Sequence, residues 1–119
     1  MSNIPLLALE ETLERMAGDT ELLTNLFALF QTDAPKKLAS IRQFETEGDL
    51  YQVGRVAHSL KGASATVGAA RLCQAAIELE QAAKAADTAD LATKHEELEK
   101  ICRQTLDAMH AFCAQTQQP

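Results

Sequence analysis

Residues 49–68 read DLYQVGRVAHSLKGASATVG, and their apolar side chains recur every three to four positions. This spacing places them on one face of an α-helix, in which each residue advances by about 100°. Asp49 is a favourable N-cap residue, and Gly68 is suited to end or interrupt the helix. The stretch therefore predicts an amphipathic helix with a buried face made of Leu50, Val53, Ala57, Leu60, Ser64 and Val67.

Helical spacing continues on both sides of this segment. Four further helices are expected over residues 8–16, 22–44, 69–86 and 89–113. Gly18 closes the first of them as a left-handed cap, and Asp19 caps the second. Pro35 either bends one long second helix, which we favour, or follows a new start at Asp33. Long amphipathic helices joined by short turns predict an all-α fold, an antiparallel up-and-down four-helix bundle with a short N-terminal lid helix.

Composition supports this fold class. Only 4% of the 119 residues are aromatic, while alanine supplies 21 residues, a bias that favours helices over strands. The length suits one domain over residues 1–119, and the 46% of apolar residues suffice for one core. We expect an ordered core over about residues 8–113, followed by a polar, frayed tail at residues 115–119.

The charge balance and the cysteines exclude several classes of function. A net charge of −6 with scattered basic residues argues against nucleic-acid binding. No apolar run reaches the roughly 20 residues that a membrane helix needs, and the N-terminus does not resemble a secretory signal. Three cysteines without paired spacing predict reduced thiols packed as small apolar groups: Cys73, Cys102 and Cys113. We expect a cytoplasmic protein without membrane insertion.

His58 projects from the expected helix almost opposite the apolar face, toward solvent. Gly54 and Gly62 lie one turn away on either side of it. Lys61 follows at i+3, and Ala65 lies two turns on. Each interior glycine costs a helix about 1 kcal/mol relative to alanine, and on the exposed side core packing does not account for them.

Two interpretations of this arrangement stay open from the residues alone. An exposed histidine beside a lysine is common surface decoration, and the glycines could serve packing against a neighbouring helix. Alternatively, a histidine that receives a phosphoryl group needs open space, which Gly54 and Gly62 supply, and a cation such as Lys61 to offset the incoming charge. Imidazole is partly neutral at cellular pH and can act as a nucleophile.

The sequence HSLKGAS at residues 58–64, preceded by Ala57, resembles the phosphoacceptor signature of histidine-containing phosphotransfer (HPt) domains. The resemblance covers about residues 9–112. Further segments resemble family positions in the expected order, namely residues 18–23, Phe30, 33–35, 48–49, 67–69 and 79–80.

The resemblance implies a role for several residues. His58 would be the phosphorylated histidine, Lys61 would stabilise the phosphoryl group, and Gly62 would give a partner access. Glu80 matches the position at which some members use glutamine to orient the imidazole. A carboxylate there can accept an imidazole N–H but would repel the phosphoryl group.

The resemblance also implies a histidine phosphocarrier of a two-component phosphorelay. Its partners would be response-regulator receiver domains, including that of a hybrid histidine kinase. The acceptor aspartate and the divalent cation would belong to the receiver, so we expect no cofactor and no metal on this chain. The chain shows no nucleotide-binding motif, and we expect a monomer that is not an enzyme and does not phosphorylate itself from ATP.

The surface near His58 suggests how a partner would dock. We expect the partner to contact Gly54, Arg55, Lys61 and Ala65, with the basic residues steering an acidic receiver pocket. The second helix has more apolar residues than one stripe needs. The excess residues either pack under the first helix or form a docking patch beside His58, and they are Leu22, Leu26 and Leu29.

Other polar residues give weaker signals. His95 and His110 are interpreted as residues of a solvated helix surface, since the second histidine of a zinc-protease helix is absent. Asp107 and His110 could face a metal in a metal-carboxylate bundle, but the inward positions of the other helices are apolar. Ser59 and Ser64 are assigned to packing or local hydrogen bonds. A bundle that binds proteins without phosphotransfer is the main alternative function.

Overall fold

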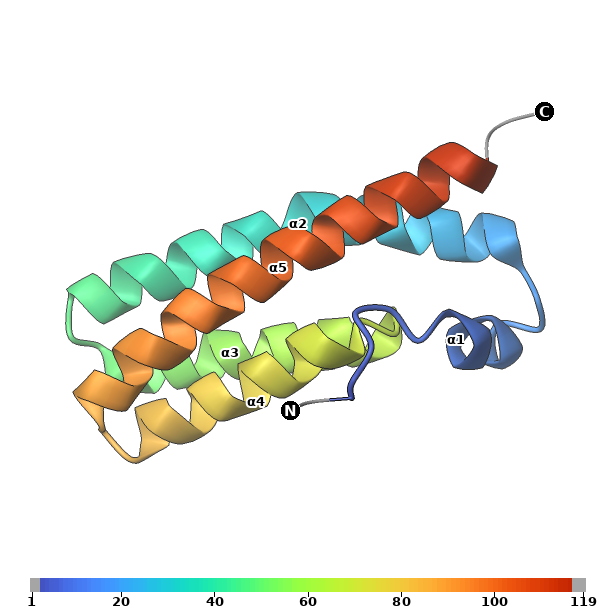
Figure 1. Cartoon of the computed structure of the whole chain (residues 1–119). Coiled ribbons are helices and arrows are strands. Elements are labelled where there is room, and N and C mark those ends of the chain that lie inside the picture. The colour runs from blue at the N-terminus through green and yellow to red at the C-terminus, as the bar shows by residue number, and fades with distance from the viewer. Residues whose placement is uncertain (1–2, 117–119) are drawn as a thin grey trace.

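The computed structural model describes residues 3–116, and within that range the chain forms five α-helices and no strand (Figure 1). The all-helical prediction is confirmed. In chain order the helices are α1 (Leu9–Arg15), α2 (Thr20–Thr46), α3 (Leu50–Thr66), α4 (Ala70–Lys84) and α5 (Thr88–Thr116).

Aspartate side chains cap the starts of α2 and α3, as predicted. The Asp19 carboxylate accepts the backbone N–H of Leu22 at 2.9 Å at the start of α2. Asp49 accepts the N–H of Gln52 in the same way at 3.2 Å at the start of α3. These contacts satisfy backbone donors that have no partner within the first helical turn.

Two helices differ from the expected boundaries in informative ways. Helix α2 continues through Pro35, so the prediction of one long helix is confirmed and a new start at Asp33 is wrong. Helix α5 reaches Thr116, so Gln115 and Thr116 are helical rather than part of a frayed tail. Residues 117–119 of the expected tail lie outside the described residues.

Each of the helices α2 to α5 packs against two others, and their apolar stripes meet in one core. Helix α2 contacts α3 and α5, and α4 contacts the same two helices (Figure 1). The predicted inward face of α3 is buried, with Leu50 half-buried. The Ser64 hydroxyl is buried without a hydrogen-bond partner in the described part of the chain, so this residue serves packing. The largest fully buried side chains include Phe27, Leu23, Ile41, Leu60, Leu72, Leu79, Leu91, Leu98 and Met109.

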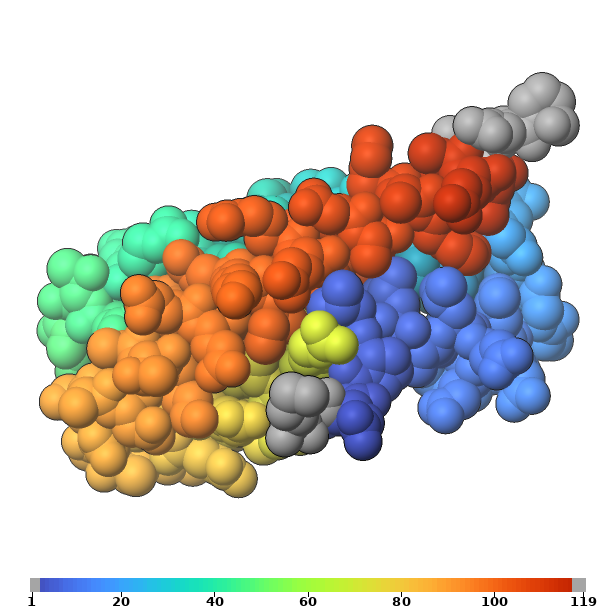
Figure 2. All heavy atoms as spheres, in the orientation of Figure 1, coloured from blue at the N-terminus to red at the C-terminus, as the bar shows by residue number. Residues whose placement is uncertain are grey.

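The segment before α1 is bonded to the turn between α3 and α4. The N–H of Ala8 donates to the carbonyl of Gly68 at 2.9 Å, and the N–H of Arg71 donates to that of Pro5 at 3.0 Å. Arg71 Nε also donates to the Ile4 carbonyl at 2.9 Å. Figure 2 shows this dark-blue segment filling the surface between α5 and the start of α4. The contacts fix the N-terminal segment on one end of the helices.

Most of the second apolar stripe of α2 remains at the surface. Leu22 is 42% exposed and Leu29 is 67% exposed, so the prediction that these two residues pack under α1 is wrong. Leu26 is half-buried against the core. The exposed leucines leave the docking interpretation open.

The three cysteines are free thiols, as predicted. Cys102 is buried, and this burial, with a smaller contribution from the charge of Glu99, raises the pKa of its thiol to about 11. None of the helices within residues 3–116 combines the length and the apolar character that a membrane crossing requires.

We predict that Gly68→Ala destabilises the fold more than Gly48→Ala. Both glycines have positive φ, +74° and +75°, a conformation that costs a side-chain-bearing residue about 1–2 kcal/mol. At Gly68 a Cβ would also lie 2.0 Å from Thr12 Oγ1, whereas at Gly48 it would meet nothing within 4 Å. We expect a loss of unfolding free energy of about 1–2 kcal/mol for Gly48→Ala and about 2–5 kcal/mol for Gly68→Ala. Equal losses in urea denaturation would contradict this account of Gly68.

Candidate functional site

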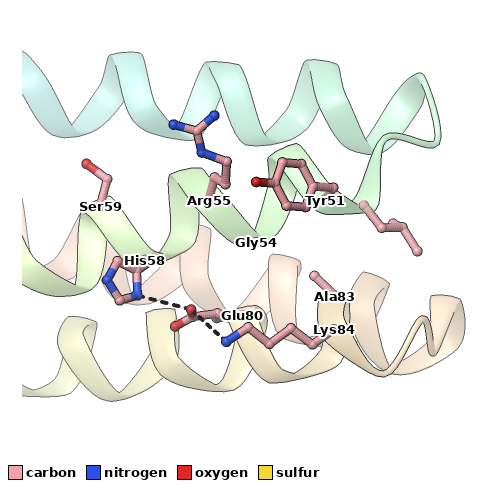
Figure 3. Close-up of a pocket in the computed structure, with 9 residues that line it drawn as sticks. Tyr51, Gly54, Arg55, His58, Ser59, Glu80, Ala83 and Lys84 are labelled. Carbon is pink, nitrogen blue, oxygen red and sulfur yellow. Dashed lines mark hydrogen bonds and ion pairs between the residues drawn. The ribbon is translucent and has the colours of Figure 1, made fainter.

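The imidazole of His58 stands on the outer side of α3, as predicted. Its side chain is 63% exposed, and its Nδ1 atom lies 3.0 Å from Oε2 of Glu80 on α4. Figure 3 shows the second ring nitrogen pointing away from Glu80. One ring nitrogen is therefore engaged by the protein, and the other faces open space.

Glu80 is a buried carboxylate with three partners. The residue is 8% exposed, and besides His58 its oxygens accept from Lys84 Nζ at 3.2 Å and Lys61 Nζ at 3.4 Å. A buried charge is tolerated only where such partners replace water. Burial raises the pKa of this carboxyl group, but the hydrogen bonds outweigh burial. The pKa of Glu80 consequently lies below its usual value, and the group is charged at neutral pH.

Two lysines near His58 contact Glu80, and one of them, Lys61, is among the residues predicted for the site. The Lys61 ammonium contacts Glu80, and through this carboxylate it joins the cluster around His58. Lys84 completes the cluster from α4 and is missing from the residues that we predicted (Figure 3). Its signal in the sequence is the i,i+4 spacing from Glu80, which favours an ion pair on a helix.

The two glycines near His58 have different surroundings. Gly62 is open, because a Cβ there would meet nothing within 4 Å. Gly54 is buried, and a Cβ there would lie 3.8 Å from the Cβ of Ala83 on α4. The prediction that Gly54 lies on the exposed side is wrong, since it faces the neighbouring helix. Packing against α4 therefore accounts for a small residue at position 54.

His58 borders a cleft of about 610 Å³ between α3 and α4. Figure 3 shows Arg55 and Ser59 pointing from α3 toward the α2 side, away from Glu80. Arg55 also lines a second hollow together with Lys36 and Lys37 of α2. The lining of the cleft comprises Leu50, Tyr51, Gly54, Arg55, His58, Ser59, Glu80, Ala83 and Lys84.

Ala65 is exposed but is not part of this lining. Its carbonyl accepts a bond from Arg15 Nη2 at 3.4 Å, which links α3 to α1. On the other side of α3, Leu29 and Ala63 line an apolar hollow of about 490 Å³ between α2 and α3. The excess apolar surface of α2 therefore borders the helix that carries His58.

The other histidines have separate environments. His95 is not on a solvated surface as predicted, because its side chain is only 12% exposed and both ring nitrogens face carboxylates, those of Glu45 and Glu99. His110 is exposed, as predicted. Among residues 3–116, no group of three or more histidine, cysteine, aspartate or glutamate residues could hold a metal ion.

Comparison with known proteins identifies the family. The family model described as Hpt domain matches residues 25–118, which is most of the chain. The chain belongs to the Hpt domain family. The Hpt domain is 33% identical over 84 residues to the phosphorelay protein LuxU of Vibrio cholerae serotype O1, an alignment that covers 71% of this chain and 72% of LuxU. No solved structure gave a significant match.

The match confirms the expected function of a histidine phosphocarrier in a phosphorelay. The structure adds the spatial arrangement of the site, which the sequence match does not give. It brings His58, Lys61 and Glu80 into one cluster with Lys84, and it places Gly62 beside open space.

We predict that the Hpt domain tolerates a large side chain at position 62 but not at position 54. Gly62→Leu should raise the free energy of unfolding by up to about 1 kcal/mol, because leucine favours the helix, position 62 is exposed, and a Cβ there meets nothing within 4 Å. Gly54→Leu should lower it by about 1–3 kcal/mol, since its side chain would press on Ala83. Thermal and urea denaturation measure both effects, and a destabilised Gly62→Leu variant would contradict the assignment of open space.

Proposed function

We propose that this Hpt domain carries a phosphoryl group on Nε2 of His58. It accepts the group from the aspartate of one receiver domain and delivers it to the aspartate of another. The observation that carries the proposal is the exposed imidazole whose Nδ1 is held by Glu80 while its other nitrogen faces open space. A nucleophile for phosphoryl transfer needs such a positioned lone pair with room for in-line approach.

The surroundings of His58 supply positive charge and access. Lys61 and Lys84 offset the charge of Glu80, so the carboxylate does not leave a net negative site for the incoming phosphoryl group. Gly62 lets the partner backbone approach the ring. Arg55 adds an exposed cation next to the cleft, and this cation attracts the acidic pocket of a receiver domain. The local positive charge matters because the Hpt domain as a whole carries a net charge of −6.

The docking face extends from the cleft across α3. It comprises the exposed residues Arg55 and Ala65 of α3, Lys61 at the α4 edge of that helix, the cleft lined by the buried Gly54, and the hollow around Leu29 on the α2 side. Apolar area next to a charged centre is typical of transient signalling interfaces, which are small.

The chemistry needs little from this chain beyond the imidazole. The acceptor carboxylate and the divalent cation belong to the receiver, and the domain itself has no cofactor, no kinase activity and no other enzymatic activity. We further propose that α2 to α5 act as an antiparallel four-helix bundle with α1 as a lid. The domain works as a cytoplasmic monomer, and its receiver partners include that of a hybrid histidine kinase.

Transfer of radiolabel from phosphorylated receiver domains tests the proposal. The wild-type domain should gain acid-labile, base-stable label, and His58→Gln should gain only background label. Gly62→Leu should remain folded and lose at least about tenfold in transfer rate, equivalent to 1.4 kcal/mol, because its side chain blocks the partner.

The same experiment separates phosphotransfer from simple protein binding. If the bundle were an interaction module only, His58→Gln would bind the receiver as well as the wild type does. Neither the wild-type domain nor His58→Gln would then gain label. Equal labelling of wild type and His58→Gln across several receivers would contradict the assignment of His58.

A further inference from the structure

We propose that Lys36 of α2 and Arg55 of α3 form a second recognition point beside His58. This point selects and orients receiver domains that carry carboxylates on the surface next to their phosphorylation pocket. The inference rests on the proposed function and names a chemical property of the partner. It concerns the α2 side of α3, whereas His58 and Glu80 meet on the α4 side.

The two cations line a hollow of about 360 Å³ between α2 and α3, which we call the basic hollow. Its polar lining comprises Lys36, Lys37, Ser40, Gln52, Arg55 and Ser59. None of the described residues that line it is acidic. Ammonium, guanidinium, hydroxyl and amide groups can all donate hydrogen bonds, so the basic hollow is suited to receive carboxylates.

Lys36 and Arg55 carry positive charge that the domain itself does not neutralise. Both residues are exposed, and among residues 3–116 neither side chain forms a hydrogen bond or an ion pair. Lys37, in contrast, is paired with Asp33 one turn earlier on α2. The free charge of the basic hollow therefore comes from Lys36 and Arg55.

Two cations of α5 show what a neutralised surface looks like in the same domain. Lys100 and Arg103 also lack a hydrogen bond or ion pair within the described part of the chain. Their hollow, however, is lined in addition by three carboxylates, those of Glu96, Glu97 and Glu99. These carboxylates offset the two cations, so the α5 hollow does not attract an acidic partner as the basic hollow does.

The basic hollow adjoins the cleft that contains His58. Arg55 and Ser59 line both of them, and in Figure 3 these two side chains point toward α2 while His58 and Glu80 lie toward α4. A protein seated over the exposed ring of His58 therefore also covers the basic hollow. Since the phosphorylation pocket of the partner must lie at His58 itself, Lys36 and Arg55 meet a different part of the partner surface.

The face formed by α2 and α3 is apolar in one half and basic in the other. Residues within 26–33 of α2 and 63–67 of α3 line the apolar hollow around Leu29, whereas residues within 36–40 of α2 and 52–59 of α3 line the basic hollow. A partner with an apolar patch and an acidic segment fits this face in one orientation. The reverse orientation would set the cations against apolar surface and leave them without partners, which is unfavourable.

The exposure of Lys36 and Arg55 favours a protein surface over a small bound anion. A small anion is held by donors that enclose it, and these two side chains lie at the surface instead. Exposed charges act mainly on the approach and the orientation of a charged protein, and they disfavour partners of the same sign. The guanidinium of Arg55 can in addition bind a carboxylate through two parallel hydrogen bonds.

Charge reversal at the basic hollow tests this inference. Transfer from the phosphorylated receiver that labels the wild type fastest is measured relative to labelling by phosphoramidate, a small donor that needs no docking surface. For Lys36→Glu/Arg55→Glu this ratio should fall at least about tenfold in about 50 mM salt. In about 500 mM salt the loss should shrink to about threefold or less, because salt screens exposed charges. Lys36→Gln/Arg55→Gln should show a smaller loss, since it removes the attraction without adding repulsion.

Lys100→Glu/Arg103→Glu is the matched control. It changes the net charge of the domain by the same amount, but on α5 and outside both the cleft and the basic hollow. We expect its ratio to stay within about twofold of the wild type. Equal losses in the two charge-reversed variants would overturn the inference, because overall charge would then explain the effect.

The receiver provides a reciprocal test. Each exposed acidic residue around its phosphorylation pocket is changed to lysine in turn. At least one of these receiver variants should transfer more slowly to the wild-type domain and faster to Lys36→Glu/Arg55→Glu than the unchanged receiver does. If no receiver variant restores transfer in this way, the assignment of a carboxylate to the basic hollow is wrong.

The outcomes distinguish this inference from the proposed function. If Lys36→Glu/Arg55→Glu accepts the phosphoryl group from the receiver as fast as the wild type in low salt, the role of the basic hollow is wrong while the carrier function stands. If neither phosphoramidate nor a phosphorylated receiver labels His58 in the wild type, both proposals are wrong.

Discussion

Close packing of α3 against α4 is the constraint on which the site depends. Gly54 and Ala83 meet where these two helices approach each other, and their small size permits the approach. One turn further along α3, the same contact brings His58 within 3.0 Å of the buried Glu80 carboxylate. A buried charge requires donors, and the imidazole is one of the donors that Glu80 receives. The orientation of the ring thus follows from helix packing and from the need to pair this carboxylate.

Much of the fold and the centre of the site could be predicted because both depend on interactions between residues close together in the sequence. The 3.6-residue period determines which face of α3 is buried, and it therefore predicts that His58 points outward. Asp19 and Asp49 mark helix starts through bonds to residues only three positions away. The resemblance to HPt domains pointed to Glu80 as the residue beside the imidazole, and the structure places its Oε2 atom 3.0 Å from His58 Nδ1.

The features that the sequence did not predict arise from contacts between helices. Gly54 lies at the edge of the exposed face in helical phase, and only the position of α4 shows that it is covered. His95 was assigned to solvent, but Glu45 of α2, 50 residues away, lies over it. Lys84 could have been found from its i,i+4 spacing to Glu80. Its role as a partner that compensates a buried charge depends, however, on the burial of Glu80, which the spacing does not show. The end of α5 was predicted too early because polar residues can continue a helix without joining the core.

The central claim is that Glu80 engages one ring nitrogen of His58 and leaves the other for the phosphoryl group. The most direct measurement is nitrogen–phosphorus coupling in NMR spectra of the ring-15N-labelled, phosphorylated domain. The account predicts coupling of phosphorus to Nε2, with Nδ1 carrying a hydrogen bonded to Glu80. Phosphorus bonded to Nδ1, the atom that lies 3.0 Å from the Glu80 carboxylate, would contradict it.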